Sequence, residues 1–132
     1  MRLFELCGED RDIRFSPFVW RVRLALAHKG LAYDCVPVRF LEKDAFAESG
    51  SRTVPVLEDG GRWVSESWDI AVYLEQTYPN RASLFGGPRG MALARFVNAF
   101  ADMAVLRSLF PMLAKDIEGV LDPENAAYFR ES

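Results

Sequence analysis

The sequence has no large excess of either charge and no block of basic residues. Its 16 lysine and arginine side chains are slightly outnumbered by 19 acidic ones, which leaves a net charge of −3. A surface that binds nucleic acid normally needs clustered positive charge to neutralise phosphates. We therefore expect no nucleic-acid partner.

The chain is also poor in cysteine and histidine, with two and one respectively. Cys7 and Cys35 lie far apart, each inside an apolar run, and so predict two buried thiols in a reducing compartment rather than a disulfide framework. No spacing typical of metal ligands is present. His28, the single histidine, is predicted to lie on the surface in the last turn of a helix.

Long apolar runs are missing as well. No run approaches the 18 residues of a membrane-spanning helix. Glu9 and Asp10 interrupt the opening apolar segment too soon for a signal peptide. These absences predict a cytoplasmic protein with no membrane partner.

What is present predicts a mixed sheet flanked by helices. Half of the 132 residues are apolar and 27% are charged, which suits one compact domain, or one domain and part of another. Residues 3–7 have the length and polarity of a strand. Ser16-Pro17 then predicts a helix start, with Ser16 as its cap, and Gly30 predicts the helix end. A second strand at 33–38 would lie parallel to the first because a helix connects them.

The stretch from 52 to 68 carries the main functional signal. Pro55 has no N–H to give to a sheet, so we expect Val54-Pro55 to begin an edge strand and to leave one backbone position open to a ligand. Asp59-Gly60-Gly61 predicts a tight hairpin turn into a fourth strand at 62–64.

A helix start follows this hairpin. Ser65 and Ser67 precede the helical repeat of Ile70, Tyr73 and Leu74, so their hydroxyls are placed to cap the helix. Unpaired amides at such an end attract a carboxylate. Together with the open strand position, they predict a shallow site for an extended peptide-like ligand with a carboxylate at one end.

The chain changes character after about residue 80. Residues 81–90, with Gly86-Gly87-Pro88, have the composition of a linker. Apolar residues then repeat at helical spacing from 93 to 117, with a kink expected at Pro111, and Asp122-Pro123 begins another helix. So much apolar surface on one helix needs partners, so either the chain is truncated or another subunit covers the stripe.

Three short motifs, Ser16-Pro17-Phe18, Val54-Pro55-Val56-Leu57 and Glu66-Ser67, together resemble the glutathione transferase family. The resemblance runs from Arg2 to about Tyr78. It implies a thioredoxin-like glutathione-binding domain over 1–80, followed over 91–132 by only the first helices of an all-α domain. Within the family, the segments 16–21 and 63–68 look closest to bacterial enzymes that cleave β-aryl ethers and to their fungal relatives.

The resemblance also implies roles for individual residues. Ser16 would donate a hydrogen bond to the sulfur of glutathione and favour its thiolate form. The backbone of Val54, ahead of a cis Pro55, would pair with the cysteinyl part of glutathione. Glu66 would face the ammonium and Ser67 the carboxylate of the γ-glutamyl end.

One departure from the family pattern concerns the glycyl carboxylate. Many relatives have a basic residue directly before Val-Pro, whereas this chain has Thr53 there and Arg52 one position earlier. In a strand, a shift of one residue turns a side chain to the other face, which leaves the role of Arg52 open. Trp20 and Trp68 are candidates to line the pocket, with buried packing as the favoured reading. The family likeness further implies a small hydrophobic electrophile as co-substrate and a homodimer.

Two other function classes remain as alternatives. Glutaredoxin-like thiol–disulfide oxidoreductases share the fold and use two cysteines at the first helix, but Ser16-Pro17-Phe18-Val19 contains neither, so the nucleophile is missing. A non-catalytic glutathione-binding or assembly module is the stronger alternative, because most of the second domain is absent from the sequence.

Overall fold

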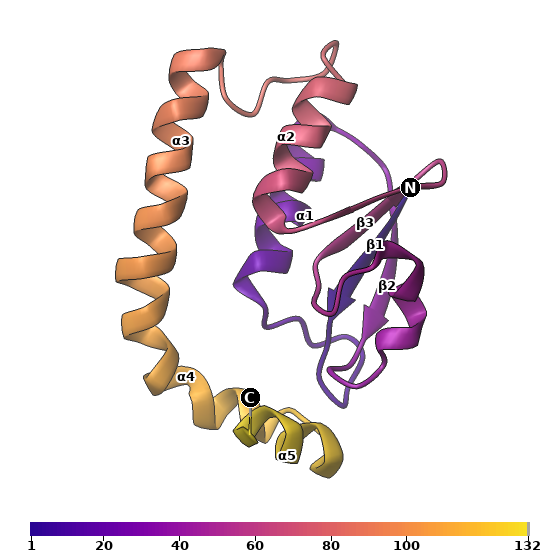
Figure 1. The fold of residues 1–132 in the computed structure, drawn as a ribbon. Helices are drawn as coiled ribbons and strands as arrows, with labels where there is room; N and C mark the ends of the chain where they lie inside the picture. Colours follow the sequence, from indigo (N-terminus) through magenta and orange to yellow (C-terminus); the bar gives the residue numbers. More distant parts are fainter. Residues whose placement is uncertain (132) are drawn as a thin grey trace.

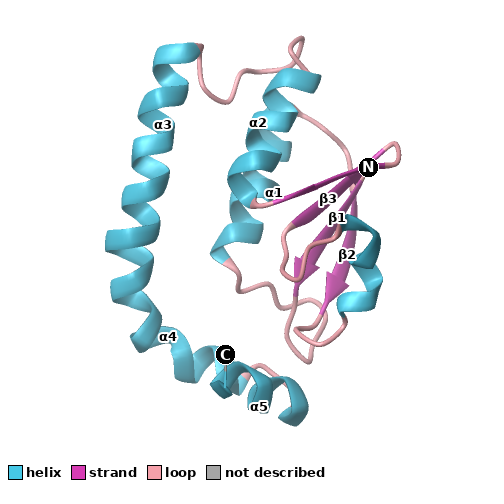
Figure 2. Ribbon diagram, viewed as in Figure 1, coloured by secondary structure: helices cyan, strands magenta, loops and turns pink. Residues whose placement is uncertain are grey.

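The computed structural model describes residues 1–131. Figures 1 and 2 show a small sheet covered by helices and, beside it, a long helix that leads to a short C-terminal one. The elements in chain order are β1 (Arg2–Leu6), α1 (Pro17–Lys29), β2 (Asp34–Val38), the 3₁₀ segment η1 (Lys43–Ser49), β3 (Val56–Asp59), β4 (Arg62–Ser65), α2 (Ser67–Thr77), α3 (Pro88–Phe100), the π-helical segment η2 (Ala101–Leu106), α4 (Arg107–Gly119) and α5 (Pro123–Glu131).

The sheet has four strands in the order β2-β1-β3-β4. β1 pairs parallel with β2 and antiparallel with β3, and β3 pairs antiparallel with β4. The predicted mixed sheet with flanking helices and a helical continuation is confirmed. Gly60 and Gly61, both at positive φ, form the two-residue turn between β3 and β4 that their sequence predicts.

Alternate residues of the strands bury the two faces of the sheet. Leu3 and Leu57 pack against α1 and α2, whereas Phe4 and Val56 pack against Phe46 of η1 on the opposite face. This alternation follows from the two-residue period of a strand. Helices α1 and α2 cover one face of the sheet and η1 covers the other. A ligand can therefore approach at the loops that follow the carboxyl ends of β1 and β2.

One strand prediction is wrong. Val54-Pro55 does not begin an edge strand, because β3 lies inside the sheet between β1 and β4. β3 begins only at Val56, so Pro55 stands just outside the ladder, where its missing N–H breaks no sheet hydrogen bond.

Helix α1 begins and ends as its sequence predicts. Ser16 is the N-cap, Pro17 occupies the first helical position and Gly30 closes the helix at a φ of 64°. His28 is exposed, as expected, and its Nε2 lies 3.0 Å from the carbonyl oxygen of Ser83. Lys29, in contrast, is buried and its Nζ lies 2.8 Å from Glu75 Oε2.

The second half contacts the first at several points. Arg21 of α1 donates to Asp102 Oδ1 at 2.5 Å and to Asn98 Oδ1 at 3.0 Å. At the other end of the long helix, Asn125 Oδ1 of α5 accepts from the Leu41 amide at 3.1 Å. Figure 1 shows the result: α3 runs alongside α1 and α2, and α5 lies below the ends of β1 and β2.

The segments α3, η2 and α4 form one continuous helix that bends within α4, the segment that contains Pro111. Pro88–Gly119 is, by length and composition alone, long and apolar enough to cross a membrane, with a mean hydropathy of 1.3 in its most apolar window. Seven charged residues lie along it, and one of them, Asp102, pairs with Arg21 of α1. None of its most apolar window is buried within residues 1–131, and one helix of this kind does not by itself establish a membrane span.

Large apolar side chains on this helix are uncovered, as the sequence pattern predicts. Leu93, Phe96 and Met103 are 64%, 69% and 72% exposed. No residue of α3, η2 or α4 is buried. A helix with this much exposed apolar surface is typical of a face that packs against further protein.

Candidate functional site

The main cavity has a volume of about 620 Å³ and lies between the loops at the carboxyl ends of β1 and β2 and the helices α4 and α5. Five of the six residues that the sequence predicts for the site line this cavity, although they come from three separate parts of the chain. They are Ser16, Arg52, Val54, Pro55 and Glu66.

Ser16 reaches the cavity at the N-terminal end of α1. Its Oγ accepts a hydrogen bond from the Val19 amide at 3.4 Å, so Ser16 caps the helix, and the residue is 7% exposed. Among residues 1–131 its hydroxyl donates no hydrogen bond. A hydroxyl proton at the positive end of a helix suits a bound anion.

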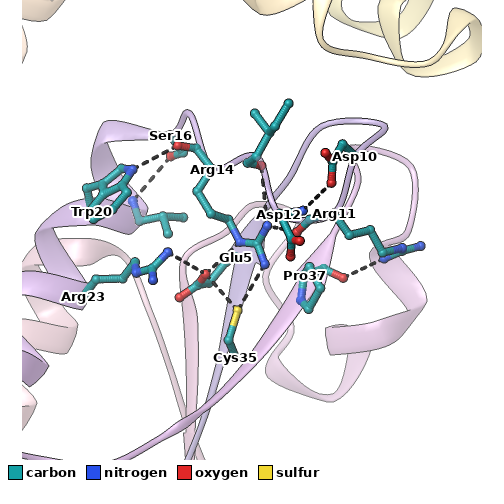
Figure 3. A network of polar contacts seen from close by, with 12 residues as sticks. Glu5, Asp10, Arg11, Asp12, Arg14, Ser16, Trp20, Arg23, Cys35 and Pro37 are labelled. Atoms are coloured by element: carbon teal, nitrogen blue, oxygen red, sulfur yellow. Dashed lines mark hydrogen bonds and ion pairs between the residues drawn. The ribbon is translucent and has the colours of Figure 1, made fainter.

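The loop before Ser16 is anchored by a polar cluster that the sequence did not reveal (Figure 3). Arg14 Nε lies 2.9 Å from Glu5 Oε2, and Arg14 Nη2 donates to Cys35 Sγ at 3.3 Å. The Cys35 thiol in turn donates to Glu5 Oε2 at 2.9 Å, and Arg23 Nη1 lies 3.5 Å from the same oxygen. Arg14 thereby joins β1, β2 and the loop that carries Ser16.

Glu5 is the buried centre of this cluster. It is fully buried, and its second oxygen, Oε1, has no hydrogen-bond partner within the described residues. Two guanidinium groups compensate its charge, as a buried carboxylate requires. A single acidic residue between the apolar side chains of Phe4 and Leu6 was the only sequence signal for this cluster.

The two thiols differ from their prediction in one respect. Cys7 is buried as expected, and burial raises the pKa of its thiol. Cys35 is exposed rather than buried because it lies on β2, the edge strand. Burial of the sulfur atom and the hydrogen bond to Glu5 nevertheless raise the pKa of Cys35, against an opposing effect of Arg14. Both thiols are therefore protonated at neutral pH.

The Val54–Pro55 peptide bond is cis, and both residues line the cavity. Residues 52–54 form a bend rather than a strand. The alternation of strand faces therefore does not apply to them, and both Arg52 and Thr53 line the cavity. Arg52 is exposed, so its guanidinium is accessible to a ligand.

Glu66 and Ser67, at the start of α2, line different cavities. Glu66 is the N-cap at a φ of 70°, an uncommon conformation for a residue other than glycine, and no side chain caps the helix. The predicted capping by the serine hydroxyls is therefore wrong. Glu66 is exposed and lines the main cavity, whereas Ser67 is buried and lines a second cavity of about 570 Å³ between α2 and α3.

Aromatic side chains cover much of the cavity wall. Phe40 has ring contacts to Phe15 at 6.2 Å, to Tyr128 at 5.9 Å and to Phe129 at 5.8 Å, and Phe110 lies 6.0 Å from Phe129. Sequence reasoning missed this set because its members come from two loops and two helices. Only the fold brings them together.

The two tryptophans proposed for the pocket lie elsewhere. Trp20 is 43% exposed rather than buried, and its indole N–H donates to the Arg14 carbonyl at 3.0 Å. Trp68 lies in the second cavity, with its ring 5.4 Å from that of Phe85. Across residues 1–131, no group of three or more His, Cys, Asp or Glu side chains is placed to hold a metal ion.

The sequence of this chain is similar to those of one family of known proteins. Residues 15–77 match the family model described as "Glutathione S-transferase, N-terminal domain". Glutathione S-transferase Z1 of Arabidopsis thaliana is 38% identical over 96 residues, which are 69% of this chain and 42% of that protein. The chain spans about half the length of the curated relatives it matches.

Solved structures show the same likeness in three dimensions. A glutathione S-transferase of Ceriporiopsis subvermispora, crystallised with glutathione, is 29% identical with a TM-score of 0.85, covering 98% of this chain and 57% of that one. Glutathione transferase GSTFuA2 of Phanerochaete chrysosporium is 26% identical with a TM-score of 0.86, covering 98% and 58%. Both sources are fungal, in agreement with the likeness to fungal relatives that the sequence indicated.

Proposed function

Because this chain belongs to the glutathione S-transferase family and carries its thioredoxin-like domain, we propose that it binds glutathione in the main cavity and transfers it to an electrophilic carbon. The observation that carries the proposal is the meeting of three elements around one cavity. These are the capped N-terminus of α1 at Ser16, the cis Val54–Pro55 peptide and the N-terminus of α2 at Glu66.

In this proposal Ser16 activates the thiol and is not itself a nucleophile. A free thiol has a pKa of about 8.5, so little of it is thiolate at neutral pH. The Ser16 hydroxyl donates to the sulfur, and the positive end of α1 adds further preference for the anion. A fall of about two pKa units would correspond to roughly 2.7 kcal/mol in favour of the thiolate.

The rest of glutathione lies along the cavity wall. The backbone of Val54 pairs with the cysteinyl part like an added strand. Glu66 takes the ammonium of the γ-glutamyl end. The carboxylate of that end extends past Glu66 to the free amides at the start of α2, including that of Ser67, which lines the second cavity. Arg52 takes the glycyl carboxylate, since it lines the cavity and forms no ion pair among residues 1–131.

The proposal divides the chain into the glutathione-binding domain at 1–80, a linker at 81–90 and the first helices of an all-α domain at 91–132. The structure begins α3 at Pro88, inside the expected linker. We place the protein in the cytoplasm as a homodimer, with the exposed stripe on α3 and α4 available for burial. The co-substrate is a small hydrophobic electrophile, with aryl ethers as one class to test.

A non-catalytic glutathione-binding module remains the second candidate, because the chain spans about half of its curated relatives. Calorimetric titration with glutathione, followed by mass spectrometry for a thioether product with an aromatic electrophile, separates the two. Binding with product formation supports the transferase, and binding without product supports the module. Absence of binding contradicts both.

A further inference from the structure

The charged side chains around the main cavity are strongly unbalanced. Four cationic residues line it, Arg39, Lys43, Arg52 and Arg107, against the single carboxylate of Glu66. The remaining lining is mainly apolar, although the chain as a whole has a net charge of −3. A cavity with this lining attracts anions.

Two of these four cations are engaged within the protein. Arg39 Nη1 lies 3.6 Å from Asp122 Oδ2, and Arg39 Nη2 donates to the Glu9 carbonyl at 3.0 Å. Lys43 Nζ donates to the Tyr128 hydroxyl at 2.9 Å and lies 4.8 Å from the centre of its ring. The contacts with Asp122 and Tyr128 join the first domain to α5 and to the residue just before it.

The other two cations have no such partner. Neither Arg52 nor Arg107 forms an ion pair or a side-chain hydrogen bond with any described residue, and both are exposed. They come from different walls, Arg52 from the bend before the cis peptide and Arg107 from the first residue of α4. The proposed function provides a carboxylate for Arg52 but provides none for Arg107.

A chain of aromatic rings lies along the same cavity. Phe15, next to Ser16 in sequence, contacts Phe40, which contacts Phe129, which contacts Phe110 of α4. Phe110 is one helical turn after Arg107. Stacked or tilted contacts with these faces favour a flat aromatic ligand.

We propose that the electrophile of this site is an aromatic compound with an anionic substituent, its ring against the Phe15–Phe40–Phe129–Phe110 chain and its anion paired with Arg107. The inference rests on the proposed function, since the same cavity must also hold glutathione. A neutral aromatic ligand would cover Arg107 without giving it a counter-charge, which is unfavourable.

The reaction balances without any oxidant or metal. With an aryl chloride, the thiolate sulfur forms a bond to the ring carbon that carries chlorine. The carbon–chlorine bond breaks, and chloride leaves with the electron pair. The proton lost from the glutathione thiol goes to solvent.

The test compares two probes that differ by one carboxylate, 2-chloro-1,3-dinitrobenzene and 4-chloro-3,5-dinitrobenzoate. We expect Arg107→Gln in the 132-residue chain to lower kcat/KM for the benzoate roughly tenfold or more, and for the neutral probe less than about twofold. Arg107→Lys should restore part of the benzoate rate, because it keeps the charge. Arg89→Gln, at an exposed arginine of α3 outside the cavity, is the matched control and should change neither rate.

A binding measurement makes the result independent of turnover. In the presence of glutathione, unreactive 3,5-dinitrobenzoate should bind more tightly than 1,3-dinitrobenzene by calorimetry, and Arg107→Gln should abolish the difference. Equal affinities in the unmodified chain, or equal loss of both ligands in Arg107→Gln, would overturn the inference while glutathione binding still supports the proposed function. If glutathione itself does not bind, both proposals fail.

Discussion

The Arg14 guanidinium lies 2.9 Å from the buried carboxylate of Glu5, two residues before the serine that caps α1. Burial by itself lowers the pKa of Arg14, but hydrogen bonds to Cys35 and Glu5 raise it above its usual value. Arg14 therefore stays charged at neutral pH. It joins the core of the sheet to the loop from which Ser16 reaches the cavity.

The first prediction concerns this pair. Glu5→Gln leaves Arg14 and Arg23 without their shared carboxylate and should lower the free energy of unfolding by about 3–5 kcal/mol, as found when one partner of a buried ion pair is removed. Urea unfolding measures the change. Glu118→Gln, which breaks the exposed pair with Arg130, is the matched control and should cost less than about 1 kcal/mol. Equal losses in the two variants would show that Glu5 does not stabilise the fold in this way.

The second prediction concerns Ser16. Ser16→Ala removes the hydroxyl donor and should reduce turnover with glutathione and an aromatic electrophile tenfold or more, while the glutathione Kd stays within about threefold. Loss of the cap should also cost about 1 kcal/mol of stability. The ultraviolet absorbance of the bound thiolate, followed against pH, should shift to higher pH in the variant. An unchanged titration would remove Ser16 from thiol activation.

The third prediction concerns the charge and the backbone of Glu66. Glu66→Gln should weaken glutathione binding about tenfold, since the ammonium loses a charged partner. Glu66→Gly loses the same charge but tolerates the positive φ, and should raise stability by about 1 kcal/mol. Calorimetry and thermal unfolding of both variants separate the two effects. Glutathione binding that is unaltered by both changes would place the ammonium elsewhere.

The fourth prediction is a pH dependence. Burial alone would raise the pKa of Glu75, but the Leu84 amide, Lys29 and Ser83 lower it to about 2. Because the folded pKa lies below the ordinary value of 4.5, this stabilisation is complete above pH 4.5 and is lost as pH falls toward 2. We expect it to contribute about 2 kcal/mol at pH 7, after allowance for solvent screening.

Urea unfolding of the unmodified chain and of Glu75→Gln, from pH 7 down to pH 3, measures this contribution. The gap between the two curves should narrow with acidity. Glu48→Gln, at an exposed residue with no ion pair within residues 1–131, should show no such gap. A gap that is constant across the range would mean that Glu75 stabilises by packing rather than by its charge.

Local sequence signals correctly predicted the ends of helices and the turns at which a proline or glycine restricts or permits a particular backbone conformation. Pro17 and Gly30 mark the ends of α1, and Gly60-Gly61 marks the turn between β3 and β4. The prediction of an edge strand failed, because the position of a strand in a sheet depends on which other strands it pairs with. Pro55 indicated an edge strand, but β3 starts one residue later and is paired on both sides.

The sequence by itself determined the order of strands and helices along the chain, the helix cap at Ser16 and the position of Pro55 in the cis peptide. Secondary-structure propensity, helix capping and the proline ring each act over only a few residues. Only the tertiary structure decided that Glu5 lies beneath Arg14, that Ser67 faces a different cavity from Glu66, and that Phe15, Phe40 and Phe129 meet. The longest of these contacts, between Phe40 and Phe129, joins residues 89 positions apart. These contacts depend on how the sheet pairs and how α5 folds back beneath it, which no local pattern encodes.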